Sequence, residues 1–127
     1  MEGLNMKYLW TTIYVKDLEE SIVFYSDLLG LKVTQRFSAG PGKEIAFMGN
    51  GSDNETLVEL FADSSIDTVS FTESISVGFA VDSVDVMLNT VKTKSIPIHN
   101  GPFETPSFKF FTVKDPNGLN VQLFQKK

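Results

Sequence analysis

The apolar residues of the chain recur with two periods, one typical of strands and one typical of helices. Apolar and polar side chains alternate over residues 9–15, which predicts a strand, because residues two apart share a strand face. Apolar residues recur every three or four positions over 18–29, which predicts a helix packed through one side. Asp17 is placed to cap its start with Glu20 as the capping-box partner, and Gly30 is placed to end it.

The remainder of the first half has only short apolar runs, separated by turn-forming residues. Strands are predicted over 32–37, 44–48 and 57–61, with a Gly-Pro-Gly turn and a polar loop between them. The order is therefore strand, helix and three strands. Residues 62–74, rich in Ser, Thr and Asp, form the predicted joint to the second half.

The second half repeats this order. A strand is predicted over 75–81, followed by a helix capped by Asp82 or Ser83. Extended structure restarts at 96–98 and is expected to break at Pro102 and Pro106, before strands over 108–113 and 119–124. Ser95 occupies the place that Gly30 has in the first half. Because a left-handed Ser costs about 1 kcal/mol, the second helix is expected to end differently.

Two tetrads carry the repeat most clearly, Val58-Glu59-Leu60-Phe61 and Val121-Gln122-Leu123-Phe124, which differ at one position. An internal duplication of this size predicts two modules, neither of which could bury its sheet alone. We expect an α+β fold: tandem βαβββ modules forming a curved, partly closed mixed sheet with the helices on its outer face. The predicted organisation is one domain over 1–127, with modules at about 7–62 and 75–125.

Composition and charge narrow the chemistry. A chain of 127 residues, 42% hydrophobic, is of one-domain size and can bury a core. It has no Cys and a single His, which excludes thiolate chemistry and any site that needs two imidazoles from one chain. The net charge of −5 and the lack of a Lys/Arg cluster argue against nucleic acid as a partner.

No stretch approaches membrane-spanning length, and residues 1–5 show no export signal, so no membrane partner and a cytoplasmic location are predicted.

Several motifs together resemble a known family. They are Val15-Lys16-Asp17-Leu18, Ser21, Phe24-Tyr25, Leu28-Leu29-Gly30-Leu31-Lys32-Val33 and Asp115-Pro116-Asn117-Gly118. The set resembles the vicinal oxygen chelate superfamily, which includes glyoxalase I, extradiol dioxygenases, fosfomycin-resistance enzymes and bleomycin-resistance proteins. The resemblance covers residues 8–125 and is closest in layout to glyoxalase I. It specifies a fold more than a function, because the superfamily hosts many chemistries.

The resemblance also implies where a metal would be held. In glyoxalase I four side chains bind a divalent ion, and by position these correspond here to Trp10, Glu59, Ser76 and Gln122. Only Glu59 matches the family's ligand types. An indole cannot donate a lone pair, so no metal and no cofactor are predicted.

Glu59 lies among apolar neighbours on both faces of its predicted strand, and a carboxylate there needs a reason. Two interpretations stay open. Glu59 is either a cavity carboxylate that binds a ligand or acts as a catalytic base, or a relic of a metal site satisfied by Gln122 and solvent.

The residues predicted to lie on the same sheet face as Glu59 form either an aromatic-lined pocket or a filled core, and we favour the pocket. The register of 108–113 leaves Phe110 ambiguous. His99, in a predicted loop, is interpreted as a surface or satisfied histidine. The predicted ligand-binding residues are Trp10, Thr12, Tyr14, Phe61, Ser76, Phe110, Gln122 and Phe124.

Two functions remain. The preferred one is a metal-free protein that binds a small apolar or aromatic molecule, as the bleomycin-resistance branch of the resembled family does. The alternative is a glyoxalase-type lyase or isomerase with Glu59 as base or metal ligand. A homodimer is expected in either case, because edge strands need covering and proteins of the resembled family usually pair.

Overall fold

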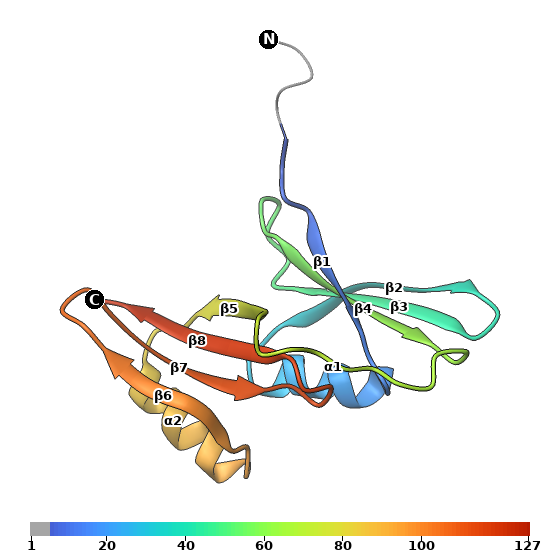
Figure 1. The fold of residues 1–127 in the computed structure, drawn as a ribbon. Helices are drawn as coiled ribbons and strands as arrows, with labels where there is room; N and C mark the ends of the chain where they lie inside the picture. Colours follow the sequence, from blue (N-terminus) through green and yellow to red (C-terminus); the bar gives the residue numbers. More distant parts are fainter. Residues whose placement is uncertain (1–5) are drawn as a thin grey trace. The chain divides into compact units, whose positions relative to one another are not determined.

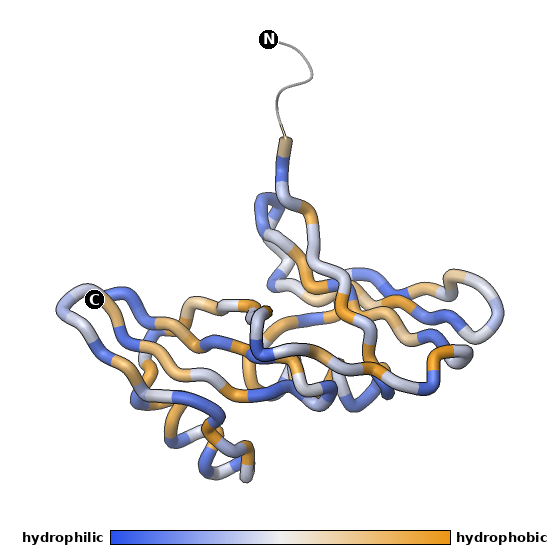
Figure 2. Tube along the Cα trace, viewed as in Figure 1, coloured by the Kyte–Doolittle hydropathy of each residue, from blue (hydrophilic) through white to orange (hydrophobic). Residues whose placement is uncertain are grey.

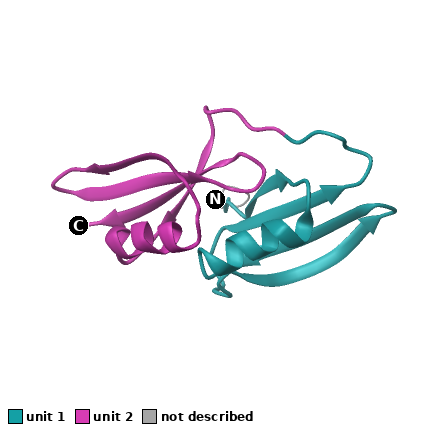
Figure 3. Cartoon of the chain, turned by 90° about the horizontal axis from the view of Figure 1, so that it is seen from below, with its two compact units in different colours: residues 1–69 teal, residues 70–127 magenta. Residues whose placement is uncertain are grey.

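The computed structural model describes residues 6–127. They form two compact units, which divide between Val69 and Ser70 and have the same order of elements (Figures 1 and 3). The first unit contains β1 (Trp10–Tyr14), α1 (Leu18–Asp27), β2 (Lys32–Gly40), β3 (Lys43–Gly49) and β4 (Leu57–Asp63). The second contains β5 (Ser76–Ala80), α2 (Val84–Thr93), β6 (Ile98–Glu104), β7 (Phe108–Lys114) and β8 (Asn120–Lys126). The predicted α+β class and the tandem βαβββ order are confirmed.

The strands form two four-stranded mixed sheets, one in each unit, and neither closes on itself. The first has the order β1-β4-β3-β2 and the second the order β5-β8-β7-β6. In each sheet the first and last strands of the unit run parallel, and the other neighbours are antiparallel.

One face of each sheet is covered by the helix of its own unit (Figure 3). In the first unit the covered face carries Ile13, Met48 and Leu60, which are buried together with Tyr25 of α1. In the second unit it carries Phe111, Val113, Val121 and Leu123, buried with Val84 and Val91 of α2. Figure 2 shows hydrophobic and hydrophilic positions alternating along the strands, so each sheet also has a second face with a different composition.

Both helices begin as the sequence predicts. The Asp17 carboxylate accepts a hydrogen bond from the Glu20 backbone N–H at 2.9 Å, and the Ser83 hydroxyl accepts one from the Val86 N–H at 3.1 Å. These side chains satisfy backbone donors that have no partner within the helix.

Both helices end at a residue in the left-handed conformation, which corrects the expectation for α2, although their closing hydrogen bonds differ. Gly30 has φ 69° and donates its N–H to the Ser26 carbonyl. Ser95 adopts the left-handed conformation too, with φ 58°. Its N–H bonds to the Lys92 carbonyl and the next N–H bonds to the Val91 carbonyl, which is a Schellman ending. These hydrogen bonds offset the strain of a left-handed Ser.

The expectation that Pro102 breaks the extended structure is wrong. Pro102 lies inside β6, after a cis Gly101–Pro102 bond, where the register with β7 shifts between Asn100 and Phe103. A bulge on an edge strand tolerates a residue that has no N–H to donate. The other predicted strands are confirmed, with ends that differ by a few residues.

No strand or helix lies between β4 and β5, which agrees with the predicted joint. The prediction about an export signal concerns residues 1–5, which lie outside the described part of the chain. Within residues 6–127, neither helix is long and apolar enough to cross a bilayer. The single-domain organisation stays a prediction.

Candidate functional site

The face of the first sheet opposite α1 gathers the residues that the sequence placed with Glu59. Parallel pairing sets Trp10 beside Leu57, Thr12 beside Glu59 and Tyr14 beside Phe61. We call this side the first open face. Its arrangement follows from strand alternation, because the odd-numbered residues of β1 point into the helix-covered core.

Two rows of side chains run across all four strands of the first open face. One row is Thr12, Glu59, Phe47 and Gln35, and the next is Tyr14, Phe61, Ile45 and Phe37. Phe37 and Phe47 were not among the predicted site residues. The alternation of β2 and β3 could have indicated them, but the bulges in β2 interrupt its parity.

Glu59 lies at the floor of this face. The residue is only 9% exposed, and its carboxylate accepts a hydrogen bond from the Thr12 hydroxyl. Trp10 packs edge-on against Phe47 with ring centroids 5.1 Å apart, and Tyr14 stacks on Phe61 at 4.9 Å. A buried carboxylate thus lies among aromatic rings. The apolar faces of such rings favour contact with an apolar ligand, and their edges orient that ligand.

The rings are nevertheless open to solvent. Trp10 is 44% and Tyr14 43% exposed, although both belong to a face that also carries buried residues. A cavity of about 300 Å³ lies beside Trp10 and Leu57, with residues of the loop between β3 and β4 in its wall. Aromatic side chains left half-exposed around a buried polar group are typical of a binding surface.

The second sheet presents an equivalent face opposite α2, which we call the second open face. Gly78, Gln122, Thr112 and Asn100 form one row across its four strands, and Ala80, Phe124, Phe110 and Phe103 form the next. The rings of Phe110 and Phe124 stack with centroids 6.5 Å apart, which resolves the ambiguous register of Phe110. Gln122 thus has the place in its row that Glu59 has in the first sheet.

A polar cavity of about 340 Å³ lies on the second open face. Two of the predicted residues, Ser76 and Gln122, line it, and the rest of its wall is Glu73, Ser74, Ile75, His99, Asn100, Thr112 and Asn120. Hydroxyls, amides and one imidazole predominate. Its chemistry differs from the ring-lined first face.

At one side of this cavity His99, Glu73 and Lys114 form a chain of charge-assisted contacts. His99 Nε2 lies 2.5 Å from Glu73 Oε1, and Lys114 Nζ donates to Glu73 Oε2 at 2.5 Å and to Asn120 Oδ1 at 3.0 Å. The Lys114 ammonium, and after it the His99 hydrogen bond, lowers the pKa of Glu73 to about 2. The carboxylate is therefore ionised at neutral pH.

His99 is satisfied, as the sequence analysis expected, but it also lines the cavity, which the sequence did not indicate. The register of β6 against β7 shifts between Ile98 and Asn100, so His99 is the extra residue of a bulge. A bulge re-aims side chains, and here His99 and Asn100 both line the polar cavity. Bulges have no reliable sequence signal.

The four positions at which glyoxalase I binds its metal can be tested by their chemistry. Glu59 is a carboxylate, Gln122 an amide and Ser76 a hydroxyl, while the Trp10 indole has no lone pair to donate. Among residues 6–127, no cluster of three or more His, Cys, Asp or Glu side chains could hold an ion. These donors do not fit a divalent metal, which needs several imidazole, carboxylate or thiolate ligands.

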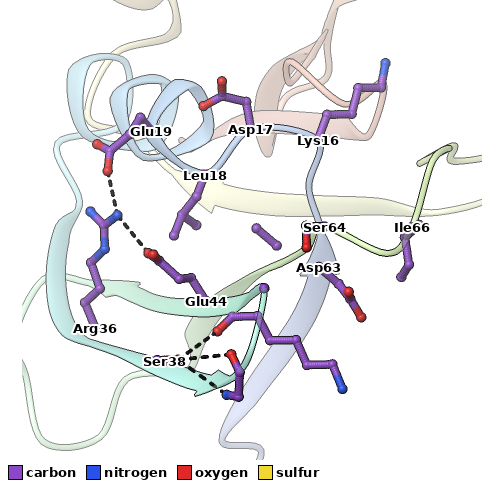
Figure 4. A pocket seen from close by; sticks show the side chains of 14 residues that line it. Lys16, Asp17, Leu18, Glu19, Arg36, Ser38, Glu44, Asp63, Ser64 and Ile66 are labelled. Atoms are coloured by element: carbon purple, nitrogen blue, oxygen red, sulfur yellow. Dashed lines mark hydrogen bonds and ion pairs between the residues drawn. The ribbon is translucent and has the colours of Figure 1, made fainter.

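A further cavity of the first unit, about 640 Å³, lies between the start of α1 and the β2–β3 hairpin (Figure 4). Arg36 lies between Glu19, at 2.6 Å, and Glu44, at 3.1 Å. The hydrogen bond to Glu19, followed by that to Glu44, raises the pKa of Arg36. The Asp63 carboxylate is bound by Ser65. Since these charges are paired and no predicted residue lies here, the cavity is a weaker candidate than the open faces.

Comparison with known proteins agrees with this architecture. Residues 7–123 match the Glyoxalase/Bleomycin resistance protein/Dioxygenase superfamily. The chain belongs to this family, and the expected resemblance is confirmed.

Individual relatives are distant. Lactoylglutathione lyase of Salmonella typhimurium is 27% identical over 96% of this chain and 94% of its own. The trypanothione-dependent glyoxalase I of Leishmania major superposes with a TM-score of 0.82 at 26% identity, over 95% of this chain and 87% of its own.

TnmS3, an antibiotic binding protein from Streptomyces sp. CB03234, has a TM-score of 0.73 at 17% identity and covers both chains fully. That likeness concerns the fold alone. Because a lyase and a binding protein share this fold, the fold does not choose between the two functions.

Proposed function

We propose that this protein binds a small apolar or aromatic molecule without metal, as a binding member of the glyoxalase/bleomycin-resistance type with a degraded metal site. The observation that carries the proposal is the first open face, where Glu59 is buried at the floor and the rings of Trp10 and Tyr14 stay half-exposed. Burial of such rings by a ligand is favourable by about 25 cal/mol per Å² of apolar surface.

Polar residues on these faces can orient a bound ligand through hydrogen bonds. Glu59 accepts from Thr12 through one oxygen, and a carboxylate has further lone pairs for a ligand O–H or N–H. In the second sheet Ser76 and Gln122 line the polar cavity, and Phe110 and Phe124 form the adjoining apolar row. We assign the predicted ligand-binding residues to these two faces, each considered by itself.

The alternative is a glyoxalase-type lyase or isomerase with Glu59 as base or metal ligand. The lactoylglutathione lyase relative, which spans nearly the whole chain, favours it. The side chains of Trp10, Ser76 and Gln122 argue against a metal-dependent lyase, because they cannot replace imidazoles and carboxylates around a divalent ion.

The intrinsic fluorescence of Trp10, the one Trp of the chain, tests the binding function. Titration with benzyl alcohol and with cyclohexanol should change the emission saturably, because Trp10 borders the proposed surface. Phe61→Ser should weaken the response, whereas the matched Val23→Ser, on an exposed position of α1, should leave it unchanged. A response that rises linearly without saturation, or equal responses in both variants, contradicts the proposal.

A second experiment separates the two functions. The protein is incubated with nickel, zinc or manganese, dialysed, analysed for metal and assayed for lactoylglutathione lyase activity. We expect neither stoichiometric metal nor activity. Retained metal together with activity that Glu59→Gln abolishes would establish the alternative.

A further inference from the structure

The second open face is divided into a polar half and an apolar half. Its polar row is occupied by Gln122, Thr112 and Asn100, and the adjoining row by Phe124, Phe110 and Phe103. Residues two apart on a strand, such as Gln122 and Phe124, are separated by about 7 Å. That spacing matches a ligand with a hydrogen-bonding group on one end and a flat apolar group on the other.

The polar half is built for hydrogen bonds that the chain does not itself complete. Thr112 is 6% exposed and lines the cavity together with Gln122. Within residues 6–127, no side-chain hydrogen bond is formed by Thr112 or by Gln122. Within residues 6–127, no buried side-chain polar atom lacks a partner, so the free polar atoms of Thr112 and Gln122 are open to solvent. A ligand in the cavity that they line can replace that solvent as their hydrogen-bond partner.

There is also room at this point. A Cβ built on Gly78 would lie 3.7 Å from the Gln122 side-chain oxygen, which is ordinary contact distance, so Gly78 leaves one side of that amide uncovered. The corresponding place in the first sheet holds Thr12, whose hydroxyl contacts Glu59.

The charged side chains at this cavity already have hydrogen-bond partners within the chain. Glu73 is ionised and is bound by both Lys114 and His99, and Lys114 also donates to Asn120 and to the Gly118 carbonyl. Neither an anionic nor a cationic ligand would find an uncompensated partner here. A neutral ligand fits this balance best.

His99 adds a directed acceptor. When its Nε2–H donates to the Glu73 carboxylate, the ring is held in the tautomer whose Nδ1 carries a lone pair. A lone pair of this kind accepts a hydrogen bond from a hydroxyl.

From these features we propose that the second open face binds an uncharged, hydroxyl-rich head group that carries a flat apolar substituent. His99, Gln122 and Thr112 hydrogen-bond the hydroxyls, and Phe110 and Phe124 pack against the substituent. Glu73 is a positioning residue that orients His99. This inference rests on the proposed small-molecule binding and specifies the ligand's chemistry at one of the two faces.

Phenyl β-D-glucopyranoside is the probe, since it joins a neutral polyol to an aromatic ring. Binding is followed through the two ¹⁵N resonances of the imidazole, which are unambiguous because the chain has one His. Saturable shifts are expected, with Nε2 protonated in the free protein. Phenyl phosphate, which carries a charged head, should bind at least tenfold more weakly by the same measure.

Single substitutions measure what each residue of the site contributes to glucoside binding. Binding in variants that lack the imidazole is followed by heat of binding. Loss of one hydrogen bond in His99→Ala or Gln122→Leu should weaken the glucoside by about threefold to tenfold. Phe124→Ser should weaken it further, and Asn89→Ala, on α2 at the opposite face, should not change it. Glu73→Gln should alter the tautomer signature of the imidazole, which a purely structural role would leave unchanged.

Two outcomes overturn the inference. One is phenyl phosphate binding as tightly as the glucoside, and the other is a glucoside affinity unaffected by His99→Ala and Gln122→Leu. If benzyl alcohol still produces a saturable Trp10 response in those cases, the proposed binding function stands and only the head-group assignment fails.

Discussion

At the scale of single residues, Glu59 and Gln122 show how one substitution in a repeat changes the chemistry of a surface. Both lie in the middle of a four-residue row on an open sheet face. Glu59 is held by Thr12 among rings, whereas Gln122 lies beside Gly78 on a polar cavity. The same backbone therefore presents a carboxylate in one unit and neutral hydrogen-bonding groups in the other.

The ion pair between Glu73 and Lys114 predicts a pH dependence. Because the folded-state pKa of Glu73 is about 2, below its ordinary 4.5, its contribution to stability is present above about pH 4.5 and is lost as the pH falls toward 2. Glu73→Gln should therefore lower the free energy of unfolding at neutral pH, and its difference from the wild type should shrink as the pH falls below about 4.5.

Urea denaturation between pH 3 and pH 7 measures this difference. In a Lys114→Met background the same substitution should have a smaller effect, because the main partner is gone. The effect is modest, since the pair is solvent-exposed and screened by salt. A difference that is flat across the whole pH range contradicts the prediction.

At the scale of elements, both helices begin at a side chain that caps the backbone and end at a left-handed residue, but the residues differ. Asp17 and Ser83 begin them, and Gly30 and Ser95 end them in the left-handed conformation. Glycine adopts that conformation without a steric penalty, whereas Ser does not.

Ser95→Gly should therefore raise the free energy of unfolding by about 1 kcal/mol, with its helix ending unchanged. The reciprocal Gly30→Ser should lower it by a similar amount and serves as the matched control. Chemical denaturation of both variants measures the changes. A destabilised Ser95→Gly protein would show that the Ser side chain contributes more than its backbone strain costs.

At β-bulges, the sequence pattern no longer predicts how far a strand extends or which face its side chains occupy. The starts of both helices could be predicted from Asp17 and Ser83, because capping is local. The extension of β6 through Pro102 and the position of His99 could not, since both depend on register shifts against β7. The exposed Phe37 on the bulged strand β2 was missed as well, and so was the buried Phe47 on β3, which pairs with β4 without a register shift.

At the scale of the whole molecule, each sheet leaves edge strands without a neighbour in its own unit. The exposed strand β2 carries Val33 and Phe37 on the edge of the first sheet, and β5 and β6 are the edges of the second. Edges of this kind promote pairing with another chain.

A homodimer is accordingly expected in solution. Size-exclusion chromatography with light scattering should give twice the mass of one chain, and the value should persist on dilution to low micromolar concentration. Val33→Lys should shift it toward the monomer if β2 takes part, while Val86→Lys, on an exposed position of α2, should not. A single-chain mass for the wild type at all concentrations contradicts this expectation.

The sequence by itself determined the α+β class, the duplicated βαβββ order, the parity that groups Trp10, Thr12 and Tyr14 with Glu59, and the membership of the family. These features follow from local periodicity and capping, which need only near neighbours along the chain. Tertiary structure alone decided the rows across each sheet, the Thr12 hydrogen bond to Glu59 and the polar cavity around His99. They depend on strand pairing between distant residues, where a single bulge changes which side chains meet.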